Sequence, residues 1–262
     1  MKWSFIILSV LVSLNGQSDQ IFVGTRPLSM GGAFIAVADD ANAITWNSAG
    51  LPGLRRTEFT STYADLYAMN INQSYFGFVR PFSDRIALGI DWSNLGFEDS
   101  ELMYSENKLN FALGIQAHRK FSFGLTLKYL MRDMQLDGTS YGKSSGIGYD
   151  AGIIYQPLKI LKVGLGFYDL NGTQISYKDK TSEEVLGQAF KLGIAYMPIN
   201  GLTIAADYGD RVHAGIEYVL ASRIGFRAGI QKGLSNEKDM LIPSAGISLK
   251  FRSLFIEYGL EN

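Results

Sequence analysis

From Glu58 onward the sequence alternates between large apolar residues and small or polar ones, with a period of two. In residues 85–93 the large apolar side chains are Ile86, Leu88, Ile90 and Trp92. The same alternation recurs in 108–118, 121–132, 147–155, 161–167, 190–196, 202–208, 212–218, 224–230, 245–251 and 254–258. Two earlier segments, 58–67 and 72–80, alternate less regularly. A sustained period of two predicts β-strands, because successive side chains of a strand point to opposite faces.

Alternation alone would also fit a soluble β-sandwich, so other features must decide the class. Here the polar face is dominated by small residues, which suits a crowded lumen better than a solvated surface. Segments of about ten residues match the length of a tilted membrane strand. Tyrosines recur at the strand ends, as an interfacial aromatic belt requires: Tyr155, Tyr196, Tyr208, Tyr218 and Tyr258. The sequence therefore predicts an all-β transmembrane antiparallel outer-membrane β-barrel.

The connections between the expected strands alternate in length. The short ones are 81–84, 118–120, 157–160, 198–201, 220–222 and 250–253. The longer, polar ones are 96–107, 133–145, 171–186 and 232–240, and only 207–211 departs from the scheme. Tight turns at one end and long loops at the other are typical of outer-membrane barrels.

We count thirteen expected strands, whereas bacterial single-chain barrels normally have an even number. One explanation, which we favour, is that a fourteenth strand is missing after residue 262. The other is that part of 20–37 supplies it. Either would remove an unpaired edge at membrane depth, where unsatisfied backbone groups are costly.

The first residues have the features of a secretory signal peptide. Lys2 is followed by an apolar run, 3–14, and by the small residues Gly16 and Ser18. The run is too short to span a membrane, so we expect residues 1–18 to be a signal peptide. Residues 19–56 would then form an N-terminal hatch and residues 57–262 the barrel.

Composition excludes several classes of function. The chain has no cysteine and a formal net charge of -1. It therefore has no disulfide or thiolate metal site and no electrostatic footprint for nucleic acid. His213 has no nucleophile marked near it, and the acidic loop residues lack metal-loop spacing. We expect no enzyme activity, no catalytic residues, no metal and no cofactor.

The segment 24–51 is dense in glycine and alanine and precedes the strands. Its distinctive residues are Gly24, Arg26, Gly31, Gly32, Asp39, Asp40, Trp46, Asn47 and Ala49. The glycine pair lets the backbone turn tightly or lie close to a wall. We expect Asp39 or Asp40 to cap a short helix over 41–46, and Asn47 to end that helix in the left-handed conformation.

Charged residues on the polar face of the strands would point into the lumen. Those singled out are Lys128, Arg132, Asp150, Arg211, Glu217 and Arg227. Basic residues outnumber acidic ones on this face, so Asp39 and Asp40 could hold the N-terminal segment by ion pairs to the lumen wall. The alternative is that both aspartates serve only as helix caps.

The order of motifs in 24–51 is similar to the N-terminal hatch of FadL-type long-chain fatty acid transporters, and it resembles the PorV/PorQ family of outer-membrane proteins still more. The resemblance rests on Gly24 and Arg26, on Gly31-Gly32-Ala33, on Ala38-Asp39-Asp40-Ala41 and on 46–51. Ser48 stands where those families have proline. The resemblance implies a fourteen-stranded barrel in the bacterial outer membrane, with the hatch blocking its lumen.

Three functions follow from these expectations. The first is passive uptake of hydrophobic or amphipathic small molecules, with outer-membrane lipid and a hydrophobic ligand as partners. The second, implied by the PorV/PorQ resemblance, is a component of the type IX secretion system that holds exported proteins at the surface. The third is a structural barrel without transport. Fold alone does not choose among them, and we rank uptake first.

Overall fold

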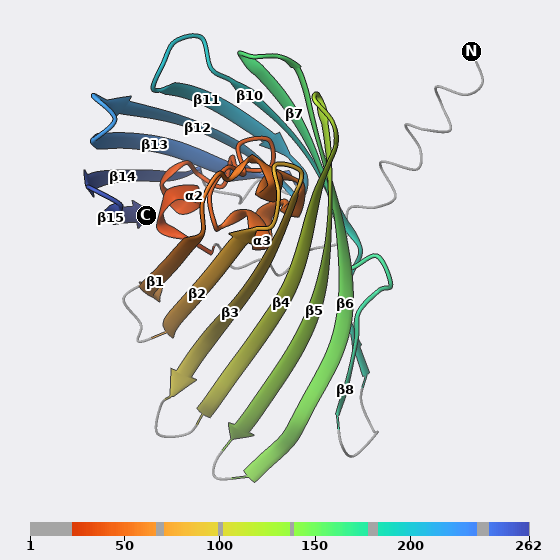
Figure 1. Ribbon diagram of the computed structural model, residues 1–262. Coiled ribbons are helices and arrows are strands. Elements are labelled where there is room, and N and C mark those ends of the chain that lie inside the picture. Colours follow the sequence, from red (N-terminus) through yellow and green to blue (C-terminus); the bar gives the residue numbers. More distant parts are fainter. Residues whose placement is uncertain are drawn as a thin grey trace.

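The computed structural model describes residues 23–66, 71–98, 102–136, 139–177, 183–234 and 241–261 (Figure 1). The expected signal peptide, residues 1–18, lies outside this range. One large antiparallel sheet curves around a compact segment near the N-terminus (Figure 1). We call residues 23–54 the inner segment, the side of the sheet that faces it the inner face, and the opposite side the outer face.

The described elements are three short helical ones followed by strands. The helical ones are α2 (Thr25–Ser29), α3 (Ala43–Trp46) and the 3-10 helix η1 (Ser48–Gly53). The strands are β1 (Glu58–Leu66), β2 (Ile71–Pro81), β3 (Ile86–Glu98), β4 (Leu102–His118), β5 (Phe121–Leu136), β6 (Thr139–Leu158), β7 (Leu161–Tyr168), β8 (Gln174–Tyr177), β9 (Glu183–Val185), β10 (Ala189–Tyr196), β11 (Leu202–Tyr208), β12 (Arg211–Leu220), β13 (Ile224–Gly233), β14 (Ile242–Phe251) and β15 (Leu254–Glu261). In the described ranges, every helix is too short or too polar to cross a membrane.

The fifteen-stranded sheet pairs its strands in chain order, apart from β8 and β9, which lie off the main path beside β6. The remaining thirteen strands agree with the number expected from the alternation. Within the described residues, β1 and β15 end the pairing order and do not pair with each other. The pairing order therefore stays open within the described residues, and α2 packs against β13, β14 and β15 near one of these edges.

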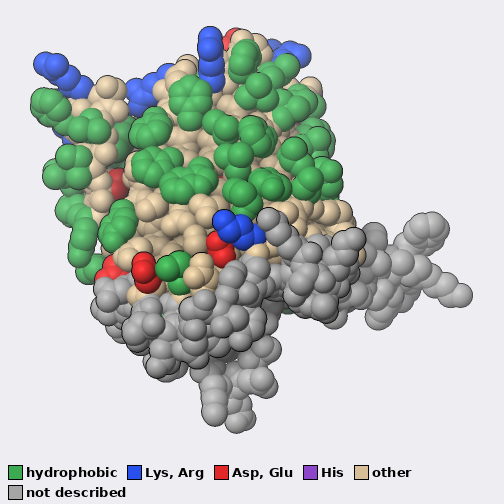
Figure 2. Space-filling model, turned by 90° about the horizontal axis from the view of Figure 1, so that it is seen from below, with side chains coloured by type: hydrophobic (Ala, Val, Ile, Leu, Met, Phe, Trp, Pro, Cys, Tyr) green, Lys and Arg blue, Asp and Glu red, His purple; other side chains and the backbone are tan. Residues whose placement is uncertain are grey.

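The two faces of the sheet differ as the alternation predicts. On β3, Ile86 and Leu88 are 41% and 44% exposed on the outer face, whereas Ala87 is fully buried. Figure 2 shows the resulting outer surface, which hydrophobic side chains cover densely. Such a surface is larger than the apolar patches of soluble monomers and suits a lipid environment.

The long connections expected at one end are partly strands instead. The β3 strand continues to Glu98 and β4 begins at Leu102, so most of the expected loop 96–107 is paired. The expected loop 133–145 is likewise mostly β5 and β6, and 171–186 contains β8 and β9. Part of 232–240 lies outside the described residues. The alternation fails in these extensions because polar residues follow one another in the sequence, although the ladder of backbone pairing continues.

Candidate functional site

The inner segment lies on the inner face of the sheet, where the sheet curves around it (Figure 1). Its side chains form the core of the molecule: Met30, Phe34, Ile35 and Ile44 are at most 1% exposed. The segment has little regular structure, so side chains must satisfy many of its backbone groups. The contacts between this segment and the sheet are the candidate functional site.

Glycines of the inner face allow the backbone of the inner segment to approach the sheet closely. A methyl group placed on Gly164 would lie 2.5 Å from Ile35 O, and one on Gly114 would lie 2.6 Å from Ser48 O. Similar clashes with the inner segment would occur on other strands, at Gly89, Gly124, Gly152, Gly193, Gly215, Gly229 and Gly246. The small residues of the alternating pattern thus form a surface shaped to this segment.

Asn47 joins the inner segment to two strands. Its amide Nδ2 donates to Ile35 O at 2.9 Å, and it also lies 3.4 Å from Ile153 O on β6 and 3.3 Å from Leu165 O on β7. Its Oδ1 accepts from Ala49 N at 3.2 Å. The backbone of Asn47 is extended (φ -164, ψ 96) and not left-handed as expected, because the residue ends α3 and begins η1 without a reversing turn.

The expected helix over 41–46 is present in shorter form as α3, Ala43–Trp46. Asp40 assists its start, since Oδ1 accepts from Asn42 N at 2.8 Å and the backbone oxygen accepts from Ala43 N at 3.0 Å. At the last residue of α3, Trp46 donates from Nε1 to Val23 O at 2.8 Å and so connects α3 to the start of the inner segment.

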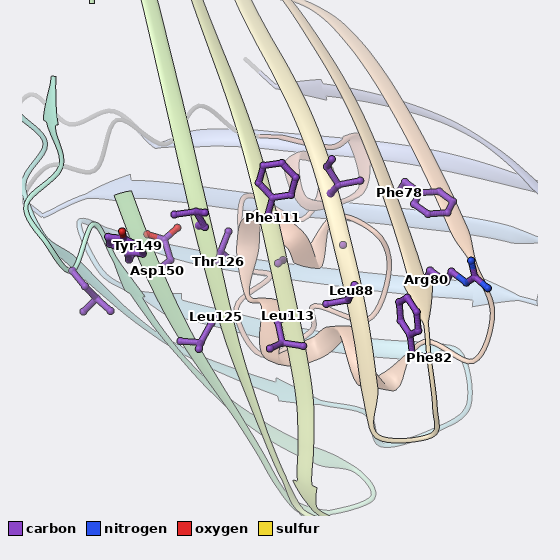
Figure 3. A pocket seen from close by; sticks show the side chains of 15 residues that line it. Phe78, Arg80, Phe82, Leu88, Phe111, Leu113, Leu125, Thr126, Tyr149 and Asp150 are labelled. Carbon is purple, nitrogen blue, oxygen red and sulfur yellow. The ribbon is translucent and has the colours of Figure 1, made fainter. Parts of the chain in front are cut away.

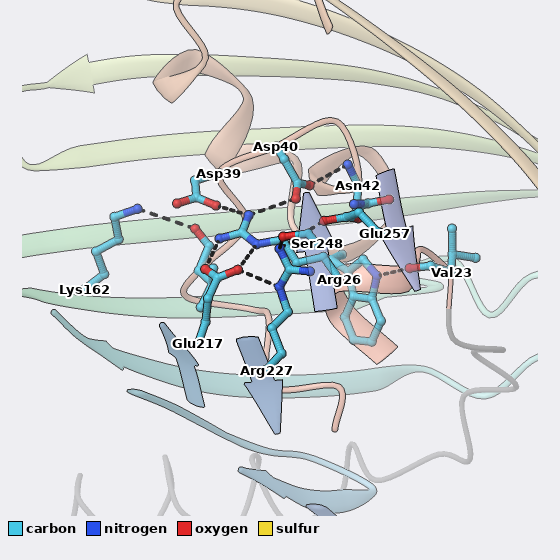
Figure 4. A network of polar contacts seen from close by, with 12 residues as sticks. Val23, Arg26, Asp39, Asp40, Asn42, Lys162, Glu217, Arg227, Ser248 and Glu257 are labelled. Atoms are coloured by element: carbon cyan, nitrogen blue, oxygen red, sulfur yellow. Dashed lines mark hydrogen bonds and ion pairs between the residues drawn. The ribbon is translucent and has the colours of Figure 1, made fainter. Parts of the chain in front are cut away.

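An ion-pair network centred on Arg26 connects the inner segment to the sheet (Figure 4). Its Nη1 lies 2.6 Å from Asp39 Oδ1 and 2.8 Å from Asp40 Oδ2, both in the inner segment. Its Nη2 lies 2.7 Å from Glu217 Oε2 on β12. The sequence suggested basic partners on the sheet for the two aspartates. Instead, the cation that pairs with them belongs to the inner segment, and the sheet supplies a carboxylate.

Arg227 on β13 extends this network. Its Nε donates to Glu217 Oε1 at 2.6 Å, and its Nη2 lies 2.9 Å from Glu257 on β15 (Figure 4). Glu217 therefore bridges two arginines, one from the inner segment and one from the sheet. Burial opposes the charge of Arg26, but its three carboxylate neighbours outweigh burial and raise the pKa of Arg26 above its ordinary value.

The side chain of Asp39 is more exposed to solvent than that of Arg26, 43% against 14%. Burial acts to raise the pKa of Asp39, but attraction from Arg26 and then from Lys162 outweighs it and lowers that pKa. Lys162 on β7 donates to Val37 O at 3.4 Å (Figure 4). The inner segment is thus surrounded by charges that keep Asp39 ionised.

Two further side chains of the sheet bind backbone groups of the inner segment. Oδ2 of Asp207 on β11 accepts from Phe34 N at 2.6 Å and from Ile35 N at 2.8 Å. Nδ1 of His213 on β12 lies 2.7 Å from Gly31 O. The alternating pattern places both residues on the inner face but does not reveal which groups they contact, so neither role was predicted.

The remaining charges singled out from the sequence lie beyond the inner segment, along β5 and β6. Nζ of Lys128 is 2.8 Å from both Asp150 Oδ1 and Asp169 Oδ1. Nε of Arg132 donates to Glu106 Oε2 at 2.6 Å, and Tyr104 donates to the same oxygen at 3.0 Å. The inner face here is polar and its charges are mutually paired.

The other residues of the sequence prediction lie at simpler positions. Gly24, Gly31 and Gly32 all have positive φ, which glycine adopts without strain. Ala49 is buried against β5, and Arg211 is half-buried at the first residue of β12. Within the described ranges, no group of three or more His, Asp or Glu side chains could hold a metal ion.

No protein-family model matches this sequence, and no curated protein matches it. Solved structures are similar in fold. The CymD monoaromatic hydrocarbon channel has a TM-score of 0.69 and 15% identity, covering 94% of each chain. The Ralstonia pickettii toluene transporter TbuX has a TM-score of 0.67 and 14% identity, covering 95% of this chain and 94% of the transporter. A Pseudomonas aeruginosa FadL homologue has a TM-score of 0.66 and 11% identity, covering 94% and 89%.

These similarities define the class of the fold, which this chain shares with proteins described as a monoaromatic hydrocarbon channel, a toluene transporter and a FadL homologue. Two of these neighbours are described as a channel and as a transporter. The resemblance to the PorV/PorQ family receives no support from the comparisons. At such low identities the relation is one of fold, so the residues of this chain must carry any statement about its function.

Proposed function

We propose that this chain is a bacterial outer-membrane channel for passive uptake of hydrophobic or amphipathic small molecules. Residues 19–56 would form a hatch and residues 57–262 the transmembrane barrel. The fold supports this proposal, since proteins described as monoaromatic hydrocarbon channels and toluene transporters share it. The densely apolar outer face supports the membrane location.

One observation carries the proposal most directly: the inner segment occupies the inner face, where its apolar side chains are buried, and polar and ionic groups join it to the strands. Arg26 pairs with Glu217, Asp207 binds the Phe34 and Ile35 amides, and Asn47 binds strand carbonyls. Contacts of this kind are directional, and water can replace them. A segment held in this way is suited to move as a unit, as a hatch must.

In this mechanism a solute enters the lumen from the end where β3 to β6 extend and meets the inner segment. The solute passes when the inner segment shifts on the glycine surface and its ion pairs exchange partners. The protein only provides a path for the solute and blocks that path while the inner segment is in place, and no covalent step is involved. We propose small apolar compounds, such as monoaromatic hydrocarbons, as the solute class. The similar structures give no support to partners in protein secretion.

Uptake by whole cells tests this proposal. Cells whose outer membrane lacks other hydrophobic channels would be given labelled toluene, labelled oleate or labelled arabinose, with and without the full-length protein. We expect faster entry of toluene or oleate and unchanged entry of arabinose. Equal uptake of both hydrophobic compounds with and without the protein would refute the proposal. A parallel rise for arabinose would show an unselective pore instead.

A further inference from the structure

An apolar groove of about 520 Å³ lies on the outer face, across strands β2 to β6 (Figure 3). It faces away from the inner segment and is therefore separate from the lumen. Most of its lining side chains are outward-pointing members of the alternating pattern, such as Leu88 and Phe111, which are 44% and 47% exposed, whereas Gly89, Ala112, Thr126 and Asp150 belong to the inner face and lie at its floor. Two charged residues are among the lining residues: Arg80, which lies beside Phe82, and Asp150, whose buried carboxylate is paired with Lys128 (Figure 3).

The strand register arranges these side chains in two rows. One row consists of directly paired residues on five successive strands: Phe78, Ile90, Phe111, Leu127 and Tyr149. The second row begins at Arg80 and continues through Leu88, Leu113 and Leu125. The groove follows these rows, so it crosses the strands and begins beside a charged group.

The dimensions of the rows suit one lipid chain. Four steps between neighbouring strands, each of about 4.8 Å, give a length of about 19 Å. With strands tilted by about 40°, this path rises about 12 Å along the membrane normal. One leaflet of the hydrocarbon core is about 15 Å thick, so the groove fits within a single leaflet.

Arg80 lies at the end of the groove next to the short turn between β2 and β3. Its guanidinium lies 5.4 Å from the centroid of the Phe82 ring, and both side chains are exposed. Other exposed basic residues lie in the short turns at this end of the sheet: Arg85, Arg119, Lys120, Lys159, Arg223 and Arg252. Figure 2 shows Lys and Arg side chains along one edge of the apolar surface. Asp84, an exposed carboxylate of these turns, is 3.9 Å from Arg55.

We infer that this groove binds an anionic phospholipid, with one acyl chain between the two rows and the phosphate at Arg80. Guanidinium groups bind phosphate through paired hydrogen bonds, and basic residues at a membrane surface attract anionic lipid. The apolar rows hold a chain, and the single cation at one end fixes its direction. The site depends on the outer face lying in a membrane and not on whether the protein transports a solute.

Lipid retention by the purified full-length protein tests this inference. The protein in mild detergent would be given equal amounts of phosphatidylglycerol and phosphatidylcholine, and bound lipids would be counted by native mass spectrometry. We expect one retained phosphatidylglycerol, favoured about fivefold over phosphatidylcholine. Equal retention of the two lipids would overturn the inference.

Two pairs of variants assign the binding to the groove. Arg80→Gln should remove the preference for phosphatidylglycerol. Arg252→Gln should not, although Arg252 also lies over an aromatic ring, 5.7 Å from the centroid of Phe251 outside the groove. Leu125→Trp should fill the groove and lower retention, whereas Leu249→Trp on the outer face of β14 should not. An unchanged preference in Arg80→Gln, or equal effects within either pair, would contradict a site in the groove.

Discussion

Arg26 and Glu217 lie 191 positions apart in the sequence and form a two-point contact between the inner segment and the sheet. Nε of Arg26 donates to Oε1 of Glu217 at 2.9 Å, and Nη2 donates to Oε2 at 2.7 Å. The side chains of Arg26 and Glu217 are 14% and 4% exposed. Paired hydrogen bonds of this geometry fix orientation as well as distance. The pair therefore ties α2 to β12 through two side chains.

The first prediction concerns Arg26. Arg26→Gln leaves Asp39, Asp40 and Glu217 facing one another without the cation between them. Breaking a buried ion pair on one side costs about 3–5 kcal/mol, so we expect the inner segment to loosen. Proteinase K should cut within residues 23–54 more readily, and single-channel conductance in bilayers should rise. Arg55→Gln, which removes an exposed arginine, is the control and should behave as the parent protein does.

The second prediction concerns the glycine surface. A methyl group at Gly124 would overlap Ala49 N and the Ser48 backbone, whereas one at Gly53 would meet nothing within 4 Å. We expect Gly124→Ala to destabilise the packed arrangement by about 1–3 kcal/mol. Gly53→Ala should change it by less than about 0.5 kcal/mol. Thermal unfolding in detergent measures the difference, and equal melting temperatures would show that the inner segment does not rest on this surface.

The third prediction separates hydrogen bonding from charge at Asp207. Asp207→Ala leaves the buried amides of Phe34 and Ile35 without an acceptor, at about 1–3 kcal/mol each. Asp207→Asn keeps an oxygen in place and should cost roughly half as much. Hydrogen–deuterium exchange at these two amides should be fastest in Asp207→Ala, intermediate in Asp207→Asn and slowest in the parent protein. Equal exchange rates in all three proteins would show that Asp207 does not protect these two amides.

The fourth prediction uses the amide of Asn47. Asn47→Asp has nearly the same shape but replaces the donor with an oxygen that faces the carbonyls of Ile35, Ile153 and Leu165. We therefore expect Asn47→Asp to be more destabilising than Asn47→Ala at neutral pH, and the difference to shrink at acid pH as the carboxyl gains a proton. Chemical unfolding at two pH values measures this. Asn200→Asp, in an exposed turn, should have little effect.

The strands and their two faces could be predicted from the sequence because the residue type at each strand position depends on whether that position faces outward or inward. On β3, Leu88 contributes to the apolar outer face and Ala87 to the inner face, and the alternation shows this without knowledge of any partner. The order of strands follows from antiparallel neighbours joined by tight turns. The prediction of long loops was wrong where a strand continues through polar residues that break the alternation, as between Asn94 and Glu106.

The contacts of the candidate site could not be predicted in the same way. The partner of Asp39 is Arg26, thirteen positions away, and the partner of Arg26 on the sheet is far along the chain. A local sequence pattern does not indicate which distant side chains will form an ion pair. The backbone of Asn47 was wrongly expected to be left-handed, since asparagine after a short helix is typical of that conformation. Its backbone is extended because η1 follows α3 directly, and its side-chain amide reaches strand carbonyls that only the folded sheet brings near.

In the proposed mechanism the inner segment must move for a solute to pass. The chain has no cysteine, so a disulfide can be introduced without competing thiols. A Cβ placed on Gly259 lies 3.1 Å from Thr25 Cγ2, close to the separation that a disulfide requires between one Cβ and the opposite sulfur; it also lies 2.5 Å from Ser29 Oγ, so the Ser29 side chain must rotate away. The double variant Thr25→Cys/Gly259→Cys would therefore fasten α2 to β15.

The measurement is toluene uptake by cells carrying this double variant, oxidised and then reduced, with each single variant as a control. We predict that oxidation slows uptake severalfold, that a reductant restores it, and that the single variants do not respond. Uptake at the same rate in the oxidised and the reduced protein would contradict the claim that movement of the inner segment opens the channel.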